Sequence, residues 1–252
     1  MKTEKITFFN NEGLQLAAKI EFPETNLPLG FALFAHCFTC NKNLTAVRNI
    51  GRALTDNGIA VLRFDFTGLG ESEGEFENTN FSSNVEDLIS AAQFLEENYE
   101  APKILIGHSL GGAAVIFAAT QLHGVSAVAT IGAPSDPTHV SHLLKSSISE
   151  IESQGEAIVD IGGRDFKVKK QFLEDLKEKS MKETVRKMKK ALLVLHSPQD
   201  DTVGIENAEA IYKAGWHPKS FISLDGADHL LTNKEDSRYV GQMIATWSRR
   251  YI

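Results

Sequence analysis

Apolar and polar positions recur with different periods along this chain, and the period identifies the elements. In the first twenty residues, apolar side chains alternate with polar ones on both sides of a turn at Asn10 to Gly13, which predicts an antiparallel hairpin. Beyond it, short continuous apolar runs are separated by stretches whose apolar residues recur every three or four positions. We predict strands at residues 31–35, 59–66, 103–106, 127–131, 191–195 and 221–224, and helices at 44–54, 85–99, 111–122, 205–214 and 239–251.

Continuous apolar strands separated by helices are typical of a parallel sheet that is covered on both faces. With the N-terminal hairpin included, we expect an α/β fold whose mostly parallel sheet has about eight strands and helices on both faces. A chain of 252 residues can bury a substantial core within a single unit. We therefore expect one domain over residues 1–252.

The alternation is interrupted between residues 134 and 190. Apolar residues first recur at helical spacing from Val140 to Ile151, and the alternating stretch that follows has Gly162–Gly163 at its centre, which predicts a β-hairpin. A further helix follows the hairpin. We expect this insertion, at about 135–190, to form a cap over the carboxyl ends of the strands, where open α/β folds bind their ligands.

Composition and charge narrow the choice of partners. A formal net charge of −7 and a pI of about 5.6 argue against nucleic acid, because binding a polyanion needs clustered positive charge. The basic stretch Lys182–Lys190 is interrupted by Glu183, Val185 and Met188, so we interpret it as a solvated helix face. No apolar run is long enough to cross a membrane, and the first residues lack the pattern of a signal peptide. We expect a cytoplasmic protein with no nucleic-acid or membrane partner, and leave its oligomeric state open.

Cys37 and Cys40 form the only CxxC of the sequence. A structural zinc site needs four ligands, and no second CxxC or paired histidine cluster completes one, so we expect no metal. A redox CxxC normally begins a helix in a thioredoxin-like context, whereas this one follows a predicted strand. We favour a packing role, with a redox or regulatory role as the alternative.

Residues 107–111 read Gly-His-Ser-Leu-Gly, the GxSxG pattern of a serine nucleophile. The predicted strand KILI runs directly into this segment and the predicted helix GAAVIFAAT runs directly out of it, which is the context of a nucleophile elbow. Glycines flank the serine because neighbouring Cβ atoms would collide with the adjoining strand and helix. We predict Ser109 as the nucleophile and the N–H of Leu110 as an oxyanion donor. The alternative is a helix cap with glycines for close packing.

A serine hydroxyl is a weak nucleophile, so the hypothesis requires a histidine base and an orienting carboxylate, in the order serine, acid, histidine. A predicted strand ends at His196, and the loop after it offers Asp200 and Asp201. The loop after the last predicted strand offers His229. We predict His229 as the base. We favour Asp200 as the acid, because its loop is similar to GxxDxxV, with Ser197 in place of the glycine and Val203 in the apolar position.

A second oxyanion donor should come from the loop after the predicted strand FALFA, which reads HCFTC. The N–H of Phe38 is our candidate. We expect structural roles for His36 in this loop and for His108 beside the serine. The candidate walls of an apolar acyl pocket are Phe38, Ile161, Phe166, Phe172 and Leu176.

Five segments, HCFTCNK, DFTGLGES, GHSLGG, SPQDDTV and GADH, resemble the α/β-hydrolase superfamily, over essentially the whole chain. The resemblance implies that Cys37 replaces the glycine of a common HG pair, that Asp65 anchors the DFTGLGES loop, and that Thr67 stands where an arginine is expected. More closely, LRFDFTGLGESEG and HPKSFISLDGADHLL resemble the hydrolase half of bacterial proteins that carry an OsmC-type domain after it. OsmC-type domains reduce organic hydroperoxides, so the resemblance implies a functional link to such a peroxidase domain. The layout of the cap is similar to that of cinnamoyl and feruloyl esterases.

These residues together predict a serine hydrolase that needs no cofactor. We expect a carboxylesterase that cleaves small or medium acyl esters through an acyl-enzyme on Ser109, with Asp200 and His229 completing a catalytic triad. A thioesterase or an aminopeptidase-like amidase is the alternative with the same chemistry. The alternative from another class is a non-catalytic binding protein whose cap seals the site.

Overall fold

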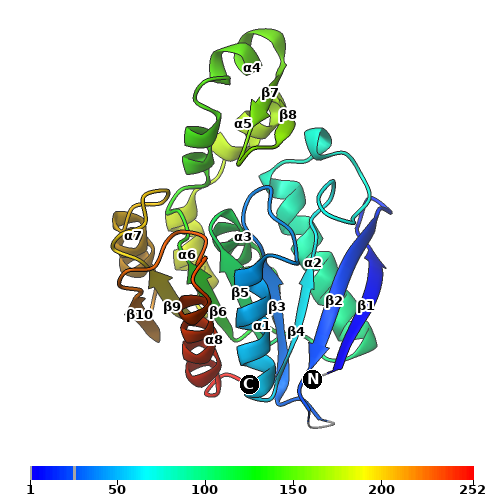
Figure 1. Ribbon diagram of the computed structural model, residues 1–252, viewed down its shortest axis with the longest axis vertical. Helices are drawn as coiled ribbons and strands as arrows, with labels where there is room; N and C mark the ends of the chain where they lie inside the picture. The colour runs from blue at the N-terminus through cyan, green and yellow to red at the C-terminus, as the bar shows by residue number, and fades with distance from the viewer. Residues whose placement is uncertain (1, 25–26) are drawn as a thin grey trace.

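The central element of the molecule is a twisted sheet (Figure 1). The computed structural model describes residues 2–24 and 27–252, so Met1 and two residues between Pro23 and Pro28, Thr25 and Asn26, lie outside the described part. Within the described residues the sheet has eight strands in the order β1-β2-β4-β3-β5-β6-β9-β10. β1 and β2 are antiparallel, as are β2 and β4, and the other neighbours are parallel. The strands are β1 (Lys2–Phe9), β2 (Gln15–Phe22), β3 (Gly30–Ala35), β4 (Ile59–Phe64), β5 (Ile104–His108), β6 (Ala127–Ile131), β9 (Ala191–His196) and β10 (Lys219–Ser223).

Helices cover both faces of the sheet, which explains why its central strands are apolar without alternation. In β3, Ala32 and Phe34 pack into the core beneath α1 (Thr45–Asp56) and α8 (Lys234–Ser248). Leu33 and Ala35 pack into the core on the opposite face. That face is covered by α2 (Phe81–Asn98), α3 (Leu110–Ala119), α6 (Met181–Met188) and α7 (Glu206–Ala214). The predicted α/β fold, with its mostly parallel sheet and helices on both faces, is confirmed.

Two helices begin earlier than their apolar periodicity predicts, because polar side chains cap them. α2 begins at Phe81, where the Asn80 side chain accepts from the N–H of Ser83 and the Ser83 hydroxyl accepts from the N–H of Asn80. α8 begins at Lys234, where the side chain of Asn233 accepts from the N–H of Glu235. The predicted starts at residues 85 and 239 are therefore wrong.

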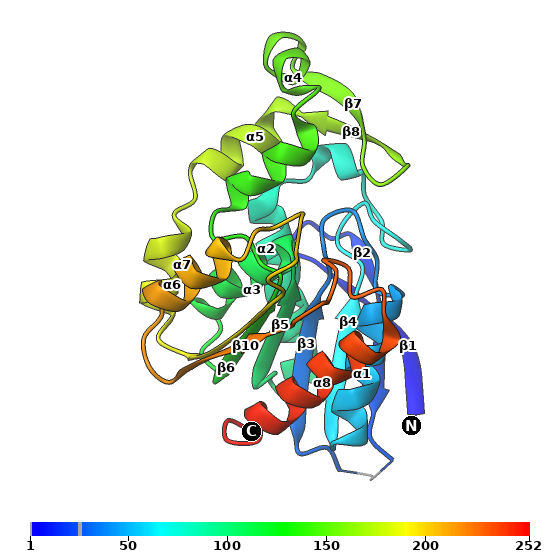
Figure 2. The same ribbon diagram turned by 60° about the vertical axis from the view of Figure 1, so that its left-hand side comes forward.

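The segment that interrupts the alternation lies at the end of the molecule opposite both termini (Figure 2). Its elements are the 3-10 helix η2 (Pro137–Leu144), then α4 (Ile148–Gln154), β7 (Glu156–Asp160), β8 (Asp165–Lys169) and α5 (Lys170–Lys177). β7 and β8 form the expected hairpin, and Gly162 and Gly163 adopt positive φ angles of 64° and 78° in its turn. The apolar residues at helical spacing from Val140 to Ile151 lie on two helices, η2 and α4. After Leu144 the chain turns, and the N–H of Ser147 donates to the Leu144 carbonyl.

The helix-face interpretation of the basic stretch holds. In α6, Lys182, Arg186 and Lys187 are exposed, whereas the interrupting Val185 and Met188 are buried.

A buried ion pair joins the loop after β3 to the loop after β4. The Asp65 carboxylate pairs with the Lys42 ammonium, and it accepts from the backbone N–H groups of Lys42 (2.6 Å) and Glu71 (2.9 Å). Lys42 and Asp65 are each about 1% exposed, and Lys42 also contacts the Glu71 carboxylate at 2.6 Å. Asp65 therefore anchors its loop, as the resemblance implies. Thr67 bonds to Asp87 instead of taking part in an ionic contact.

Replacing Lys42 with methionine is expected to lower the free energy of unfolding by about 3–5 kcal/mol, because it leaves the Asp65 carboxylate buried without its partner. Urea unfolding monitored by circular dichroism measures the loss. Lys5→Met on the exposed face of β1 is the matched control and should change stability by less than about 0.5 kcal/mol. Equal losses in both variants would contradict the anchoring role.

Candidate active site

The candidate nucleophile lies in a sharp turn between β5 and α3. Ser109 has φ 55° and ψ −127°, a left-handed backbone conformation that few side chains adopt. A Cβ at Gly107 would overlap the carbonyl of Gly111, and a Cβ at Gly111 would overlap the carbonyl of His36. Both glycines of the pattern are thus required by close backbone packing, which brings the loop after β3 against the start of α3.

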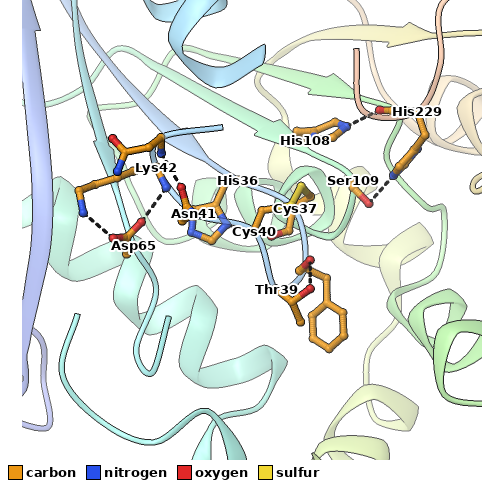
Figure 3. Close-up of a disulfide and its surroundings, with 12 residues drawn as sticks. His36, Cys37, Thr39, Cys40, Asn41, Lys42, Asp65, His108, Ser109 and His229 are labelled. Carbon is orange, nitrogen blue, oxygen red and sulfur yellow. Dashed lines mark hydrogen bonds and ion pairs between the residues drawn. A yellow bond between two sulfur atoms is a disulfide. The ribbon is translucent and has the colours of Figure 1, made fainter. Parts of the chain in front are cut away.

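Ser109, His229 and Asp200 form one hydrogen-bonded chain. His229 Nε2 is 3.0 Å from Ser109 Oγ, and His229 Nδ1 is 2.7 Å from Asp200 Oδ2 (Figure 3 shows the serine contact). The second oxygen of Asp200 accepts from the N–H groups of Thr202 (3.0 Å) and Val203 (2.8 Å). These three side chains come from the ends of different strands, and the fold brings them together.

Of the two candidate acids, Asp200 is the one beside the histidine. Burial raises the pKa of Asp200, but the hydrogen bonds from His229, Val203 and Thr202 outweigh it and hold the pKa below its ordinary value. Asp201 is exposed and contacts the hydroxyl of Thr202 at 3.3 Å. The carboxylate at position 200 is therefore ionised at neutral pH and faces the imidazole.

Three further histidines near Ser109, His229 and Asp200 are buried, and each forms a hydrogen bond to a backbone carbonyl. His108 Nε2 donates to the carbonyl of His229 (2.7 Å), His196 Nε2 to the carbonyl of Val203 (2.7 Å), and His36 Nδ1 to the carbonyl of Cys37 (2.9 Å). His36 and His108 thus have the structural roles expected of them. His196, for which no role was predicted, ends β9 as His108 ends β5, and this place at the end of an apolar strand is the signal that could have identified it.

These buried histidines are neutral at neutral pH. Burial, followed by the nearby His229, lowers the pKa of His108 to about 3. Burial also lowers the pKa of His36 to about 4 and shifts the pKa of His196 downward. Each imidazole therefore has one N–H, and that N–H is the one that donates to a backbone carbonyl.

Stability is expected to fall as the pH drops below 6.5, the ordinary pKa of histidine. Below that value the unfolded chain binds protons that buried His36 and His108 do not, so each contributes a slope of up to about 1.4 kcal/mol per pH unit until its folded pKa is reached. Urea unfolding between about pH 7 and pH 4 measures the slope. His108→Gln should make it shallower, and His123→Gln, at an exposed position, should not. A slope that His108→Gln leaves unchanged would contradict the assignment.

A small cavity of about 40 Å³ opens beside Ser109. Its lining contains both candidate oxyanion residues, Phe38 and Leu110. The other lining residues come from the loop after β6, from η2 and from the loop that carries Asp200: Pro134, His139, Val140, His142, Leu143, Thr202 and Val203. A larger hollow, about 400 Å³, is lined by Asn10, Glu86 and Asp87 among others, and does not include Ser109. The small cavity is therefore the candidate substrate site.

Four of the residues expected as pocket walls do not line the cavity beside Ser109. Ile161, Phe172 and Leu176 are buried in the apolar core that residues 135–190 share with the rest of the fold, and the partly buried Phe166 packs against that core. Phe172 packs against the Phe38 ring at 5.4 Å. The side chains of η2 line the cavity in place of those of α5. Helical spacing in the sequence identifies the buried face of a segment, but it does not identify which neighbour that face contacts.

Cys37 and Cys40 are joined by a disulfide, where the sequence favoured a packing role for the two side chains (Figure 3). The bridge encloses Phe38 and Thr39, and the N–H of Cys40 donates to the carbonyl of Cys37 at 3.1 Å. Thr39 has a φ of 59°. The loop that carries the candidate oxyanion residue Phe38 is thus a covalently closed turn.

In the part of the chain that the structure describes, no three His, Cys, Asp or Glu side chains are grouped to hold a metal ion. Nor does any helix within residues 2–24 and 27–252 have the length and apolar character needed to cross a bilayer.

The family model of serine aminopeptidase, S33, matches residues 36–154. The esterase domain of a Rhodothermus marinus protein is 52% identical over 100% of this chain and 99% of that chain, with a TM-score of 0.82. The chain belongs to the α/β-hydrolase superfamily. At 20% identity, Est1E from Butyrivibrio proteoclasticus with ferulic acid bound shares the fold, with a TM-score of 0.80 and 98% coverage of both chains.

Other relatives match shorter stretches of this chain. An uncharacterized 31.7 kDa protein of Escherichia coli is 33% identical over 114 residues. The matched stretch is 44% of this chain and 39% of that protein. The mitochondrial palmitoyl-protein thioesterase ABHD10 of Bos taurus is 32% identical over 80 residues. The matched stretch is 32% of this chain and 25% of that protein. The matched stretches thus cover less than half the length of either relative.

Proposed function

We propose that this α/β-hydrolase is a serine carboxylesterase that works through an acyl-enzyme on Ser109. The observation that carries the proposal is the hydrogen-bonded chain from Asp200 through His229 to Ser109, which ends at a cavity. A hydroxyl paired with an oriented imidazole and an ionised carboxylate is the arrangement required to activate serine.

The proposed reaction begins when Ser109 Oγ attacks the ester carbonyl and His229 Nε2 takes its proton. Asp200 holds the imidazole in the tautomer that leaves Nε2 free to accept, and it stabilises the imidazolium that forms. His229 then protonates the leaving alcohol. Water attacks the acyl-enzyme by the same route in reverse and releases the acid.

The oxyanion of the tetrahedral intermediate is proposed to bind the backbone N–H groups of Leu110 and Phe38. Leu110 is the first residue of α3, so its N–H has no acceptor within the helix, and the positive end of the helix dipole points the same way. Both residues line the cavity beside Ser109. Removing one such donor typically lowers kcat by about 10²-fold to 10³-fold.

We propose small or medium acyl groups because the cavity beside Ser109 is small, about 40 Å³. We propose that residues 135–190 act as the cap of a single domain and select the substrate through η2, which lines the cavity with Val140 and Leu143. The ferulic acid bound to Est1E adds aromatic acids to the classes worth testing, in line with the resemblance of the cap to that of feruloyl esterases.

Thioester and amide substrates are the second candidates, because a relative is a palmitoyl-protein thioesterase and the family model is a serine aminopeptidase. The same chemistry serves all three bonds. An aminopeptidase needs acidic groups to bind the amino terminus, but Glu150, Glu152 and Glu156 are exposed and do not line the cavity. Esters therefore remain the first choice.

The resemblance to OsmC fusion proteins supports one further proposal, a functional link to hydroperoxide reduction. Esters of oxidised acyl groups belong in the substrate panel for that reason.

The test is a panel of chromogenic esters of increasing acyl length, aromatic esters, matched thioesters and aminoacyl amides, combined with labelling by a fluorophosphonate. We expect short to medium esters to give the highest kcat/KM and the label to be found on Ser109. A protein that neither turns over any of these substrates nor takes the label would support a non-catalytic binding role instead.

A further inference from the structure

The disulfide has a specific place beside the candidate active site. The loop after β3 turns back through Cys37, Phe38, Thr39 and Cys40, and the bridge closes this turn around the residue whose N–H faces the oxyanion in the proposed mechanism. Phe38 lines the cavity beside Ser109, and Cys37 and Phe38 together line a second small cavity with Leu110. Both proposed donors therefore meet at the disulfide-closed turn.

Contacts from the cap also end on this turn. The guanidinium of Arg164, in the turn between β7 and β8, donates to the carbonyl of Thr39. The Phe38 ring packs between Phe172 of α5 at 5.4 Å and Phe76 at 5.7 Å. The conformation of residues 37–40 thus affects both the backbone beside the cavity and the contacts that Arg164 and Phe172 make with this turn.

The backbone of the turn is one that a free chain rarely adopts. Thr39 is a β-branched residue at φ 59°, in the left-handed region that such residues disfavour. A covalent bridge across the turn restricts it to this conformation. With the bridge open, the turn can relax toward the allowed regions and carry the Phe38 N–H away from the oxyanion position.

We propose that Cys37–Cys40 is a thiol-exchange site that controls the esterase proposed above, active with the bridge closed and impaired with it open. The proposal rests on the proposed function. It deepens that function by naming how the same site is regulated.

The exchange is expected to begin at Cys40. Cys40 is partly exposed, whereas Cys37 is 4% exposed. The thiolate of a small dithiol attacks Cys40 Sγ, the S–S bond breaks, and its electron pair leaves on Cys37, which takes a proton from water. The second thiol of the reductant then attacks the mixed disulfide and releases Cys40 as a thiol and the reductant as a disulfide. A small disulfide reverses the sequence. A thiol-rich compartment, such as the cytoplasm expected from the sequence, supplies the reducing thiols, and a small disulfide must be present for the reverse step.

The experiment compares the whole chain after treatment with dithiothreitol and after treatment with oxidised glutathione. Mass spectrometry of the alkylated protein reports the state of the two cysteines. Reduction is expected to lower kcat for a chromogenic ester by about 10-fold to 100-fold, part of the effect of losing an oxyanion donor, with KM changed by less than about threefold. Reoxidation should restore kcat. The Cys37→Ser/Cys40→Ser variant should have the low kcat and no response to dithiothreitol.

Any of three outcomes would overturn the proposal. The first is an equal kcat in the reduced and oxidised protein, and the second is a double serine variant as active as the oxidised wild type. The third concerns hydrogen exchange, which does not depend on activity: reduction should accelerate amide exchange in residues 36–44, and unchanged exchange there rejects the switch. The proposed function fails by a different result, the absence of hydrolysis and of fluorophosphonate labelling in the oxidised protein.

A separate observation concerns the residue before the nucleophile. His108 Nε2 donates to the backbone carbonyl of His229 at 2.7 Å (Figure 3). The centroids of the two imidazole rings are 5.1 Å apart. Asp200 orients the His229 ring, whereas His108 holds its backbone. The backbone of His229 is thus hydrogen-bonded to the last residue of β5, which directly precedes Ser109.

We infer that His108 is a positioning residue that sets the distance between His229 and Ser109. His108→Leu removes the donor with little change in volume, and His108→Gln retains an N–H that can reach the same carbonyl. His108→Leu should lower kcat by about 10-fold to 100-fold with KM nearly unchanged, because small misplacements of a base are costly. His108→Gln should recover most of the loss.

A merely structural residue would not produce this division between the variants. Thermal unfolding should show both variants folded. Equal kcat in His108→Leu and wild type, or equal impairment of the two variants, would overturn the inference. Amide hydrogen exchange gives a readout that does not depend on catalysis. We expect faster exchange around His229 in His108→Leu than in His108→Gln, and identical exchange in the two variants would also count against the inference.

Discussion

Ser109→Ala is expected to lower kcat for ester hydrolysis by about 10⁴-fold to 10⁶-fold, because it removes the atom that forms the acyl-enzyme. The residual rate would come from the oxyanion donors and from substrate binding alone. The fold should be retained, since alanine replaces serine at the elbow with one atom fewer and Ser109 Oγ has its contact to a histidine rather than to the core. Steady-state kinetics and circular dichroism measure the two effects.

Ser146→Ala is the matched control for this substitution. Ser146 is exposed in the segment between η2 and α4, so its variant should keep full activity. Fluorophosphonate labelling should disappear with Ser109→Ala and persist with Ser146→Ala. Substantial turnover by Ser109→Ala would mean that another group is the nucleophile.

Asp200→Asn is expected to lower kcat by about 10³-fold to 10⁴-fold. An amide beside His229 Nδ1 can donate to it, which stabilises the tautomer with the proton on Nε2, and that tautomer cannot accept the proton of Ser109. The side-chain carbonyl can still accept from the N–H groups of Thr202 and Val203, so the loop should keep its shape.

Asp201→Asn tests the alternative acid. Its side chain is exposed and contacts Thr202 rather than an imidazole, so its loss should change kcat by less than about twofold. The comparison measures kcat and KM for both variants with one ester. A larger loss at Asp201 than at Asp200 would overturn the choice of acid.

The sheet could be predicted from the sequence because burial on both faces leaves a strong local signal. Strands such as β6 (Ala127–Ile131) are continuous apolar runs, and the predicted and observed bounds coincide there. Bounds fail where a side chain caps the helix, as Asn80 does before α2, because capping extends a helix beyond its apolar face.

Part of the candidate site could also be predicted. The strand and helix around Ser109 and the order of Asp200 and His229 are local features, and the structure brings these side chains within hydrogen-bond distance. Their catalytic roles stay predictions. The pocket walls could not be found in this way, because Phe172 and Val140 carry the same helical signal and differ in what they pack against.

By itself, the sequence determined the α/β class, the elbow at Ser109 and the segments that supply an acid and a base. Each of these depends on the period and spacing of nearby residues, which reflect backbone geometry and burial. The tertiary structure decided that Asp200 and not Asp201 meets His229, that His108 bonds to the backbone of His229, and that η2 lines the cavity. It also joined Cys37 to Cys40. These results depend on which surfaces meet once the chain packs, and short-range patterns carry no information about that.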